Sequence, residues 1–163
     1  MNIRHATPDD HDAIWSILRP VFAAGETYAI ARDISKEDAL QLWRDLPKAT
    51  YVAEDQGQIL GTYYVKTNAA GGGAHVCNCG YVTAAAAQGR GVARAMCEHS
   101  QTEARALGYR AMQFNMVLAS NAGAVGLWHK LGFETVGMLP RVFDHPKLGL
   151  VDAHVMYKWL EEG

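Results

Sequence analysis

The sequence lacks the features that mark membrane and secreted proteins. Its apolar runs fall well short of the roughly 20 residues that a helix needs to cross a bilayer, and Met1–His5 does not lead into the apolar core of a signal peptide. It has only three cysteines, Cys77, Cys79 and Cys97, which cannot all pair with one another. Such sparse cysteine use is typical of a reducing compartment. We therefore expect a cytoplasmic protein with no membrane partner.

A metal centre and a nucleic-acid surface are also not expected. The seven histidines are scattered, and the spacing of Cys77 and Cys79 differs from the two-residue spacing of common zinc sites. In an alternating strand both thiols would face one side and pack as small core residues. The net charge of −2 gives no general reason to expect nucleic-acid binding.

The composition and the pattern of predicted elements favour one mixed α/β domain. Hydrophobic residues make up 49% of the 163 positions and charged residues 20%, which is an ordinary globular balance. We expect a single domain over residues 1–163, with elements in the order β-α-α-β-β-β-α-β-α-β-β. This alternation predicts a mixed α/β or α+β sheet flanked by helices. Strands are predicted at residues 3–6, 50–54, 58–67, 75–83, 111–118, 133–138 and 151–160, and helices from residues 7, 35, 92 and 121.

A glycine-containing loop, Gln88-Gly89-Arg90-Gly91, lies between a predicted strand and a predicted helix. No aspartate, serine or threonine is available to cap the helix, so its first N–H groups need another partner. Glycines let an anion approach the backbone closely, and the positive end of the helix dipole favours a phosphate. Arg90 and Arg94 add positive charge. A glycine turn capped by water is the alternative.

Two other phosphate-binding motifs fit this loop poorly. No Gly-x-x-x-x-Gly-Lys-Ser/Thr run is present. The segment from Gly89 to Arg94 begins like a dinucleotide fingerprint, but it has arginine at the third glycine position and follows a hairpin. The loop therefore needs a different explanation.

Residues 88–93, Gln-Gly-Arg-Gly-Val-Ala, resemble the Gln/Arg-x-x-Gly-x-Gly/Ala signature of the GNAT superfamily of acetyl-CoA-dependent N-acetyltransferases. The segment from Asn121 to Phe133 and the strand at 151–157 are similar to that family in order and spacing. Within it the chain most resembles the phosphinothricin acetyltransferase-like group, which acts on small amines and amino acids. The resemblance implies a mostly antiparallel sheet that splays between the strands at 75–83 and 111–118.

The resemblance also implies where acetyl-CoA binds. The loop N–H groups would hold the pyrophosphate, the end of the preceding strand would pair with the pantetheine arm, and Asn121 would contact the cofactor while capping its helix. Trp128 stands where many family members have a tyrosine that protonates the departing thiolate, and an indole cannot supply that proton. The implied cofactor-binding residues are Tyr81, Val82, Thr83, Gln88, Gly89, Arg90, Gly91, Val92, Ala93, Asn121 and Trp128.

The implied chemistry is direct attack of a neutral amine on the thioester, with a strand N–H near Val82 polarising the carbonyl. Because an amine with a pKa of about 10 is mostly protonated at pH 7, a base or a water chain must take its proton. Glu26 is the first candidate for the base, and a solvated loop acid is the simpler role. Tyr28, Asn78 and Asn115 are candidates for acceptor binding, with packing or a satisfied core amide as the alternatives.

The sequence thus predicts an N-acetyltransferase that uses acetyl-CoA and no metal, and that acts on a small-molecule amine or an amino acid. Arg141 and His145, in a predicted late loop, could bind an acceptor carboxylate or simply lie at the surface. A non-catalytic acyl-CoA-binding module, which Trp128 favours, and a protein N-terminal acetyltransferase are the alternatives. Because dimers are common in similar proteins, a homodimer is also left open.

Overall fold

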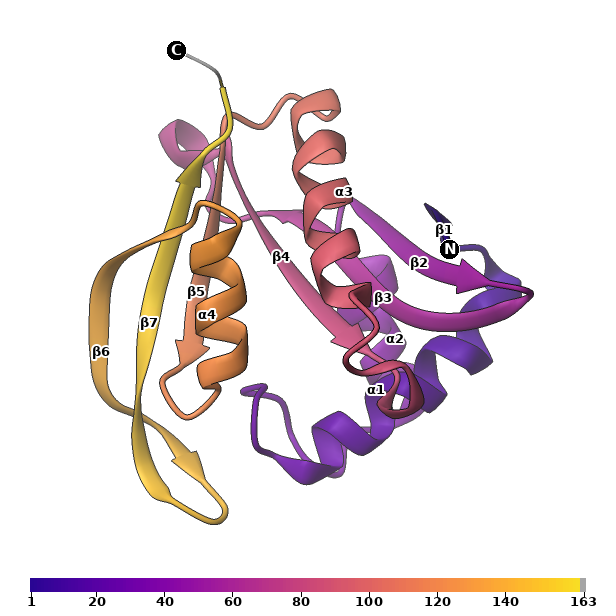
Figure 1. The fold of residues 1–163 in the computed structure, drawn as a ribbon, viewed down its shortest axis with the longest axis horizontal. Coiled ribbons are helices and arrows are strands. Elements are labelled where there is room, and N and C mark those ends of the chain that lie inside the picture. The colour runs from indigo at the N-terminus through magenta and orange to yellow at the C-terminus, as the bar shows by residue number, and fades with distance from the viewer. Residues whose placement is uncertain (162–163) are drawn as a thin grey trace.

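The computed structural model describes residues 1–161, which form a seven-stranded sheet with helices on both faces (Figure 1). The strand order is β1-β2-β3-β4-β5-β7-β6, and only β4 and β5 are parallel neighbours. The strands are β1 (Asn2–His5), β2 (Ala49–Asp55), β3 (Gln58–Thr67), β4 (Val76–Thr83), β5 (Ala111–Leu118), β6 (Glu134–His145) and β7 (Gly149–Trp159). The helices are α1 (His11–Ala24), α2 (Lys36–Leu40), α3 (Val92–Ala106) and α4 (Ala122–Lys130), with short helical turns η1 (Pro8–Asp10), η2 (Gln41–Asp45), η3 (Gly71–Gly73) and η4 (Ala85–Ala87). The predicted order and class of elements are confirmed.

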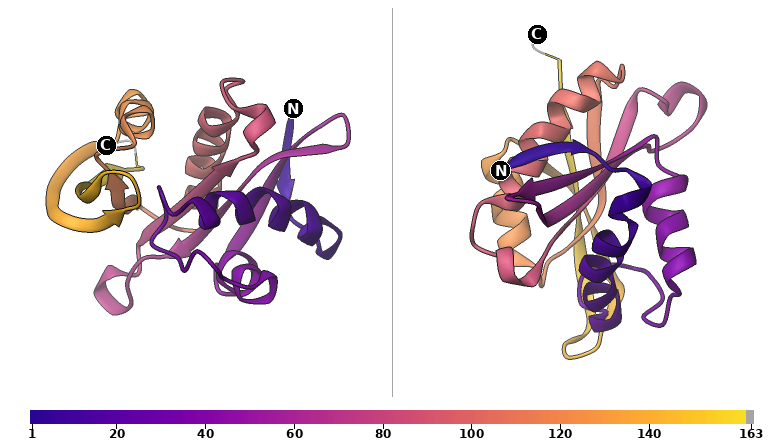
Figure 2. Two further views of the ribbon diagram at one scale, coloured as in Figure 1. Left: turned by 90° about the horizontal axis from the view of Figure 1, so that it is seen from below. Right: turned by 90° about the vertical axis from the view of Figure 1, so that its right-hand side faces the viewer.

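Figure 2 shows α1 and α2 on one face of the sheet and α3 and α4 on the other. An apolar cluster packs the helices against each face. Leu18 and Phe22 of α1 and Trp43 of η2 pack in one cluster, against β2 and β4. Met96 of α3 and Trp128 of α4 belong to the other cluster. The sheet therefore has a helical layer on each of its two faces.

Strands β4 and β5 pair only where they begin. Their register has two residue pairs, at Val76 and Cys77 of β4. The Asn78 side-chain amide then donates to the Gln113 carbonyl over 2.9 Å, and past this point the two strands diverge (Figure 1). The expected splay is confirmed, and it leaves one edge of β4 without a partner strand.

The three cysteines are free and buried, as small core residues on the α3 side of the sheet. The predicted packing of Cys77 and Cys79 is therefore confirmed. None of the helices in residues 1–161 is long and apolar enough to cross a membrane. Within the same residues, no group of three or more His, Cys, Asp or Glu side chains is placed to hold a metal ion.

The final hairpin is longer than the sequence predicted. A strand at 133–138 was expected to end in a loop, but β6 continues to its pairing with β7 across a bulge that contains Pro140 and Arg141. Arg141 has a φ of 51°, and its N–H donates to the Asp152 carboxylate over 2.8 Å. Because β6 is an edge strand, a proline at a bulge removes no ladder bond that the sheet needs. The predicted loop was wrong for this reason.

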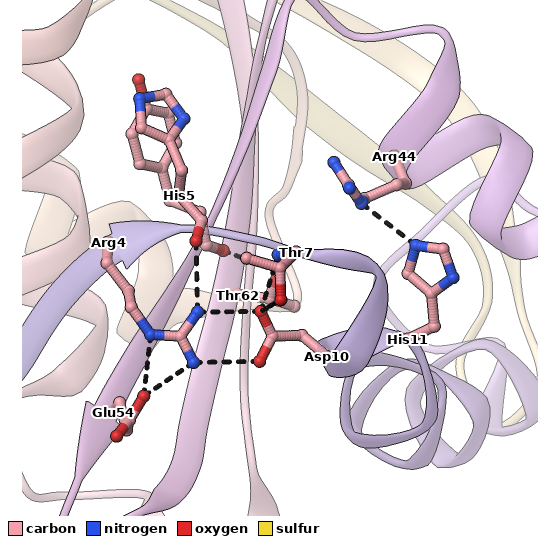
Figure 3. Close-up of polar contacts among 9 residues, drawn as sticks. Arg4, His5, Thr7, Asp10, His11, Arg44, Glu54 and Thr62 are labelled. Carbon is pink, nitrogen blue, oxygen red and sulfur yellow. Dashed lines mark hydrogen bonds and ion pairs between the residues drawn. The ribbon is translucent and has the colours of Figure 1, made fainter.

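A buried carboxylate connects the first strand to the first helix (Figure 3). Asp10 accepts two hydrogen bonds from the Arg4 guanidinium, at 2.8 and 3.0 Å, and one from the Thr7 N–H at 2.7 Å. The same guanidinium pairs with Glu54 of β2 at 2.7 Å. The hydrogen bond from Arg4 is the main cause that lowers the pKa of Asp10 to about 2. The sequence predicted that a helix starts at residue 7, but not that Arg4 pairs with Asp10 there.

Candidate active site

The diverging strands β4 and β5 open a cleft of about 1040 Å³. Its walls include the loop after α1, η2, the start of α3 and one side of α4. The glycine loop lies at the end where β4 finishes, and Lys66 and Asn78 lie toward the end where β4 begins. Small-molecule pockets commonly span roughly 300–1,000 Å³, so this cleft has room for more than one small ligand.

Backbone N–H groups gather in the glycine loop at the start of α3. Gly89 and Gly91 have left-handed φ angles of 76° and 78°, and Gly91 caps α3 without any side-chain hydrogen bond. A Cβ built on either glycine would meet no atom within 4 Å, so open space borders this backbone. Such space beside free donors at a helix N-terminus suits an anion. In this loop and the first turn of α3, the N–H groups that find no acceptor in residues 1–161 are those of Gly89, Gly91, Val92, Ala93 and Arg94.

The two arginines of the loop region point to different places. Arg90 is directed to the β2–β3 turn, where it lies 3.5 Å from the Asp55 carboxylate, and it does not line the cleft. Arg94 lines the cleft while its Nε donates to Glu98 over 3.0 Å. Gln88 also lines the cleft. Of the two guanidinium groups, only that of Arg94 therefore belongs to a residue that lines the cleft.

The free edge of β4 presents the backbone of alternate residues to the cleft. The Ala84 N–H bonds the Leu60 carbonyl of β3 over 2.8 Å, and the β3–β4 register continues without a bulge. Because bonded pairs alternate in an antiparallel ladder, the Val82 N–H points toward β3. The backbone groups of Tyr81 and Thr83 point the other way. The N–H groups near Val82 that face the cleft are therefore those of Tyr81 and Thr83, and the polarising role of such an N–H stays a prediction.

The Tyr28 hydroxyl is hydrogen-bonded to the backbone of Tyr81 at the free edge of β4. It donates to the Tyr81 carbonyl over 2.8 Å and accepts from the Tyr81 N–H over 2.9 Å. Its ring packs edge-on against Phe22 and Trp43, with centroids 5.7 and 5.9 Å away. Burial raises the pKa of Tyr28 far above its usual value. Tyr28 lines the cleft as predicted, and it does so as a neutral phenol bonded to β4.

An aromatic wall covers β4 at the end of the cleft away from the glycine loop. The Tyr64 ring lies edge-to-face with Trp43, with centroids 4.8 Å apart. The ring also lies beside Gly80, where a Cβ would come within 2.7 Å of it. Burial raises the pKa of Tyr64 to about 12. The Lys66 ammonium lies 5.3 Å from the centroid of the same ring.

Asn78 and Asn115, the two asparagines predicted to bind the acceptor, differ in burial and in the hydrogen bonds of their side chains. Asn78 is buried, and its side-chain amide donates to the Gln113 carbonyl. Asn115 is exposed and donates to the Asn68 side chain over 2.7 Å. Both line the cleft, as does Asn121, whose side chain also accepts the Ala124 N–H at 3.3 Å.

A model of the acetyltransferase (GNAT) family matches residues 11–133, which is most of the chain and includes the glycine loop and α4. The chain belongs to the GNAT acetyltransferase family. A curated relative, N-acetyltransferase aca1 from Schizosaccharomyces pombe, is 29% identical over 110 residues. That match covers 66% of this GNAT chain and 52% of the relative, so the chain spans about half the length of the curated relative it matches.

Solved structures share the fold of this GNAT protein over nearly its whole length. A GCN5-related N-acetyltransferase from Kribbella flavida is 41% identical with a TM-score of 0.92, covering 97% of this chain and 96% of that one. The yncA protein from Salmonella typhimurium, solved with acetyl-CoA, is 25% identical with a TM-score of 0.84, covering 100% and 95%. A phosphinothricin acetyltransferase from Sinorhizobium meliloti, in complex with acetyl-CoA, is 21% identical with a TM-score of 0.86, covering 99% and 89%. The expected family and fold are confirmed, and the likeness to phosphinothricin acetyltransferases is one of fold.

Trp128 of this GNAT protein lies in the cleft wall with 8% of its surface exposed. Its ring packs on Tyr81 and Phe114, with centroids 5.1 and 5.2 Å away. Within residues 1–161 the indole N–H has no hydrogen-bond partner. Because no fully buried side-chain donor there lacks a partner, the indole nitrogen is not fully buried. The Tyr81 hydroxyl, in contrast, is bonded to Ser100 at 2.7 Å. Trp128 is therefore a free donor in the wall, and it cannot transfer a proton.

Three polar residues predicted for the acceptor side do not line the cleft that residues 1–161 form. They are Glu26, Arg141 and His145. Glu26 borders a smaller neighbouring hollow of about 510 Å³ and pairs with Lys147 at 2.7 Å. The hydrogen bond from Lys147 lowers the pKa of Glu26, which makes it a weaker base. Arg141 forms the β6 bulge, and His145 accepts the Lys147 N–H at the hairpin turn. The role of Glu26 as a base stays a prediction.

Sequence reasoning missed the side chains that form the far wall of the cleft in this GNAT protein. Trp43 of η2 packs on Tyr64 of β3, and the register of β3 on β4 places Lys66 opposite Asn78. The one indication in the sequence was strand alternation, which places Tyr64 and Lys66 on the same face. Alternation alone does not say that this face borders the opening of the sheet.

Proposed function

We propose that the protein is an acetyl-CoA-dependent N-acetyltransferase that transfers the acetyl group directly to the amine of a small molecule or amino acid, within one domain over residues 1–163. The observation that carries this proposal is the set of N–H groups that have no acceptor in residues 1–161 and border the β4–β5 cleft, which are those of Gly89, Gly91, Val92, Ala93 and Arg94. Family membership and a similar structure solved with acetyl-CoA support the same cofactor. The three free cysteines support a cytoplasmic location.

The residues present fit the chemistry of coenzyme A. When bound, acetyl-CoA supplies the acetyl group as an activated thioester. The N–H groups of the glycine loop bind pyrophosphate oxygens, and Arg94 adds charge beside them. The edge backbone of Tyr81 and Thr83 offers donors and acceptors to the amides of the pantetheine arm. Gln88 and Asn121 border the same space.

Two donors of this chain suit the charge that develops during amine attack. The Tyr81 N–H, which now donates to the Tyr28 hydroxyl, would serve the carbonyl oxygen, and the Trp128 indole N–H would serve the sulfur. A thiol with a pKa of about 8.5 can leave as the thiolate. Tryptophan in place of the family's tyrosine is therefore compatible with turnover.

Removing the Tyr28 hydroxyl should lower the stability of the ligand-free protein and raise its affinity for acetyl-CoA. In Tyr28→Phe, the Tyr81 N–H and carbonyl lose their partner, so the ligand-free protein should be less stable by about 1 kcal/mol. The freed edge should bind acetyl-CoA several-fold more tightly. Thermal unfolding without ligand and calorimetric titration of acetyl-CoA measure the two effects. Weaker binding would mean that the hydroxyl contacts the cofactor instead of competing with it.

Apolar side chains on the β6–β7 hairpin support a homodimer as a separate proposal. Exposed apolar groups that gather on one element often mark an interface. Light scattering on the purified protein tests this, and a monomer at all concentrations would contradict it. The exposed residues are Val136, Met138, Val142, Leu148 and Leu150.

Release of free thiol from acetyl-CoA, measured with an amine panel, tests the proposed activity. The panel holds free amino acids, polyamines and peptides with a free N-terminus, and mass spectrometry identifies the acetylated product. Turnover of small amines is the expected result. Turnover of peptides alone would favour a protein N-terminal acetyltransferase. Acetyl-CoA binding without turnover of any amine would favour the non-catalytic module.

A further inference from the structure

The cleft carries positive charge and no carboxylate. Among its lining residues within positions 1–161, the charged side chains are Lys66 and Arg94, and none is aspartate or glutamate. Arg94 lies at the glycine loop, where the cofactor phosphates are proposed to bind. Lys66 is therefore the charge that remains for the second substrate. A cleft with one sign of charge concentrates ligand groups of the opposite sign.

Side chains that could take a proton from an amine are also missing from the lining that the structure describes. The α1, η2, β5 and α4 walls contribute no titratable group, and α3 contributes only Arg94. Apart from Lys66, the titratable groups on the other walls are uncharged phenols and a thiol, whose pKa values are all raised by burial. A protonated phenol or thiol cannot act as a base. These groups are Tyr28 of the α1–α2 loop, Tyr64 of β3, and Cys79 and Tyr81 of β4.

Resting on the proposed function, we propose that the acceptor is an amine that carries an anionic group, that Lys66 binds this group, and that the amine reacts as the free base without a side-chain base. In this step the amine nitrogen bonds to the acetyl carbon while the carbon–sulfur bond breaks. The electron pair of that bond stays on sulfur as a thiolate, and the surplus proton of the nitrogen passes to water. A dication such as a diamine would face Lys66 with no carboxylate to compensate it.

The surroundings of Lys66 suit this role. Its side chain is exposed, and among the ion pairs of residues 1–161 none involves it, so its charge is available. The Tyr64 ring lies under the ammonium, and Trp43 continues this wall toward Tyr28. An apolar body of the acceptor can pack on these rings while its anionic group reaches the lysine.

Replacing Lys66 tests the charge contact, with Lys48 as a matched control. Both lysines are exposed and lie over a tyrosine ring, at 5.3 Å for Lys66 on Tyr64 and 5.2 Å for Lys48 on Tyr109, but Lys48 does not line the cleft. Lys66→Gln should raise KM for an amino acid about tenfold, with little change in kcat. KM for the matching amino-acid amide should stay unchanged, and Lys48→Gln should alter neither.

Two further measurements, of product binding and of thermal unfolding, test the role of Lys66 without relying on turnover and detect any folding defect. Calorimetry with the N-acetyl amino acid should show weaker binding to Lys66→Gln than to Lys48→Gln. The thermal unfolding temperatures of the two variants should match. Equal KM increases for the acid and its amide, or equal product affinity in both variants, would overturn the role of Lys66.

The pH profile tests the missing base. For an acceptor that reacts as the free base, log kcat/KM should rise with a slope of one up to the pKa of the acceptor amine. The end of this rise should therefore move when acceptors with different amine pKa values are compared. A rise that ends at the same pH for all acceptors, and that disappears in Glu26→Gln, would assign a base to Glu26 and overturn the proposal.

The panel separates this inference from the proposed function. Turnover of polyamines in preference to amino acids would leave the N-acetyltransferase in place and overturn the anionic acceptor. Absence of turnover with every amine, at pH values up to the pKa of the amines, would overturn the proposed function itself. Preference for amino acids over their amides supports both.

Discussion

Replacing Gly91 by valine is expected to raise the Kd for acetyl-CoA by about 100-fold or more, which corresponds to about 2.7 kcal/mol. Gly91 has a φ of 78°, a conformation that a β-branched residue rarely adopts, and it caps α3 at the run of N–H groups without acceptors. The added side chain would occupy the open space that borders these donors. Calorimetric titration of acetyl-CoA measures the change.

Gly108→Val is the matched control, because it lies just after the opposite end of α3. Gly108 has a φ of 90°, and a Cβ there would also meet no atom within 4 Å. Both variants therefore strain a left-handed glycine, and comparable losses of thermal stability are expected. Only Gly91→Val should lose acetyl-CoA binding. Equal affinity in the two variants would show that the phosphate binds elsewhere.

Replacing Asp10 by alanine is expected to lower the free energy of unfolding by about 2 kcal/mol. The substitution leaves the Arg4 guanidinium without its two bonds to Asp10 and the Thr7 N–H without an acceptor. The value is below that for a fully buried pair, because the Arg4 side chain is 35% exposed and keeps Glu54. Chemical denaturation at pH 7 measures it.

The Asp10 contribution should also depend on pH. Its pKa is lowered from 3.8 to about 2 on folding, so the contribution is present above about pH 4 and is lost as the pH falls toward 2. The difference in stability between wild type and Asp10→Ala should shrink over this range. Asp12→Ala is the control, since Asp12 is 90% exposed and pairs with Lys36 at the surface. A loss in Asp12→Ala as large as that in Asp10→Ala would contradict the account.

Local features of the sequence predicted the parts of the site that depend on one segment. The glycine loop, the uncapped start of α3 and the Asn121 cap all follow from residues close together in the chain. The splay between β4 and β5 came from family resemblance, because nothing in either strand alone encodes where their pairing ends. The length of β6 was missed because Pro140 predicts a loop unless the strand is known to lie at an edge.

The parts of the site that depend on register could not be predicted from the sequence. Whether the N–H of Tyr81 or of Val82 faces the cleft depends on which pairs of β3 and β4 exchange hydrogen bonds. The placement of Lys66 depends on the same register. Glu26 was placed near the acceptor by its position in the α1–α2 loop, but its pairing with Lys147 joins it to the β6–β7 turn, which is more than 100 residues away.

A crystal structure of the protein with acetyl-CoA tests the central claim most directly. We predict pyrophosphate oxygens within hydrogen-bond distance of the N–H groups from Gly89 to Ala93, as the missing cap of α3. We also predict that the Tyr28 hydroxyl no longer bonds the Tyr81 N–H. A pyrophosphate bound away from this loop, with the N–H groups of α3 still facing solvent, would contradict the claim.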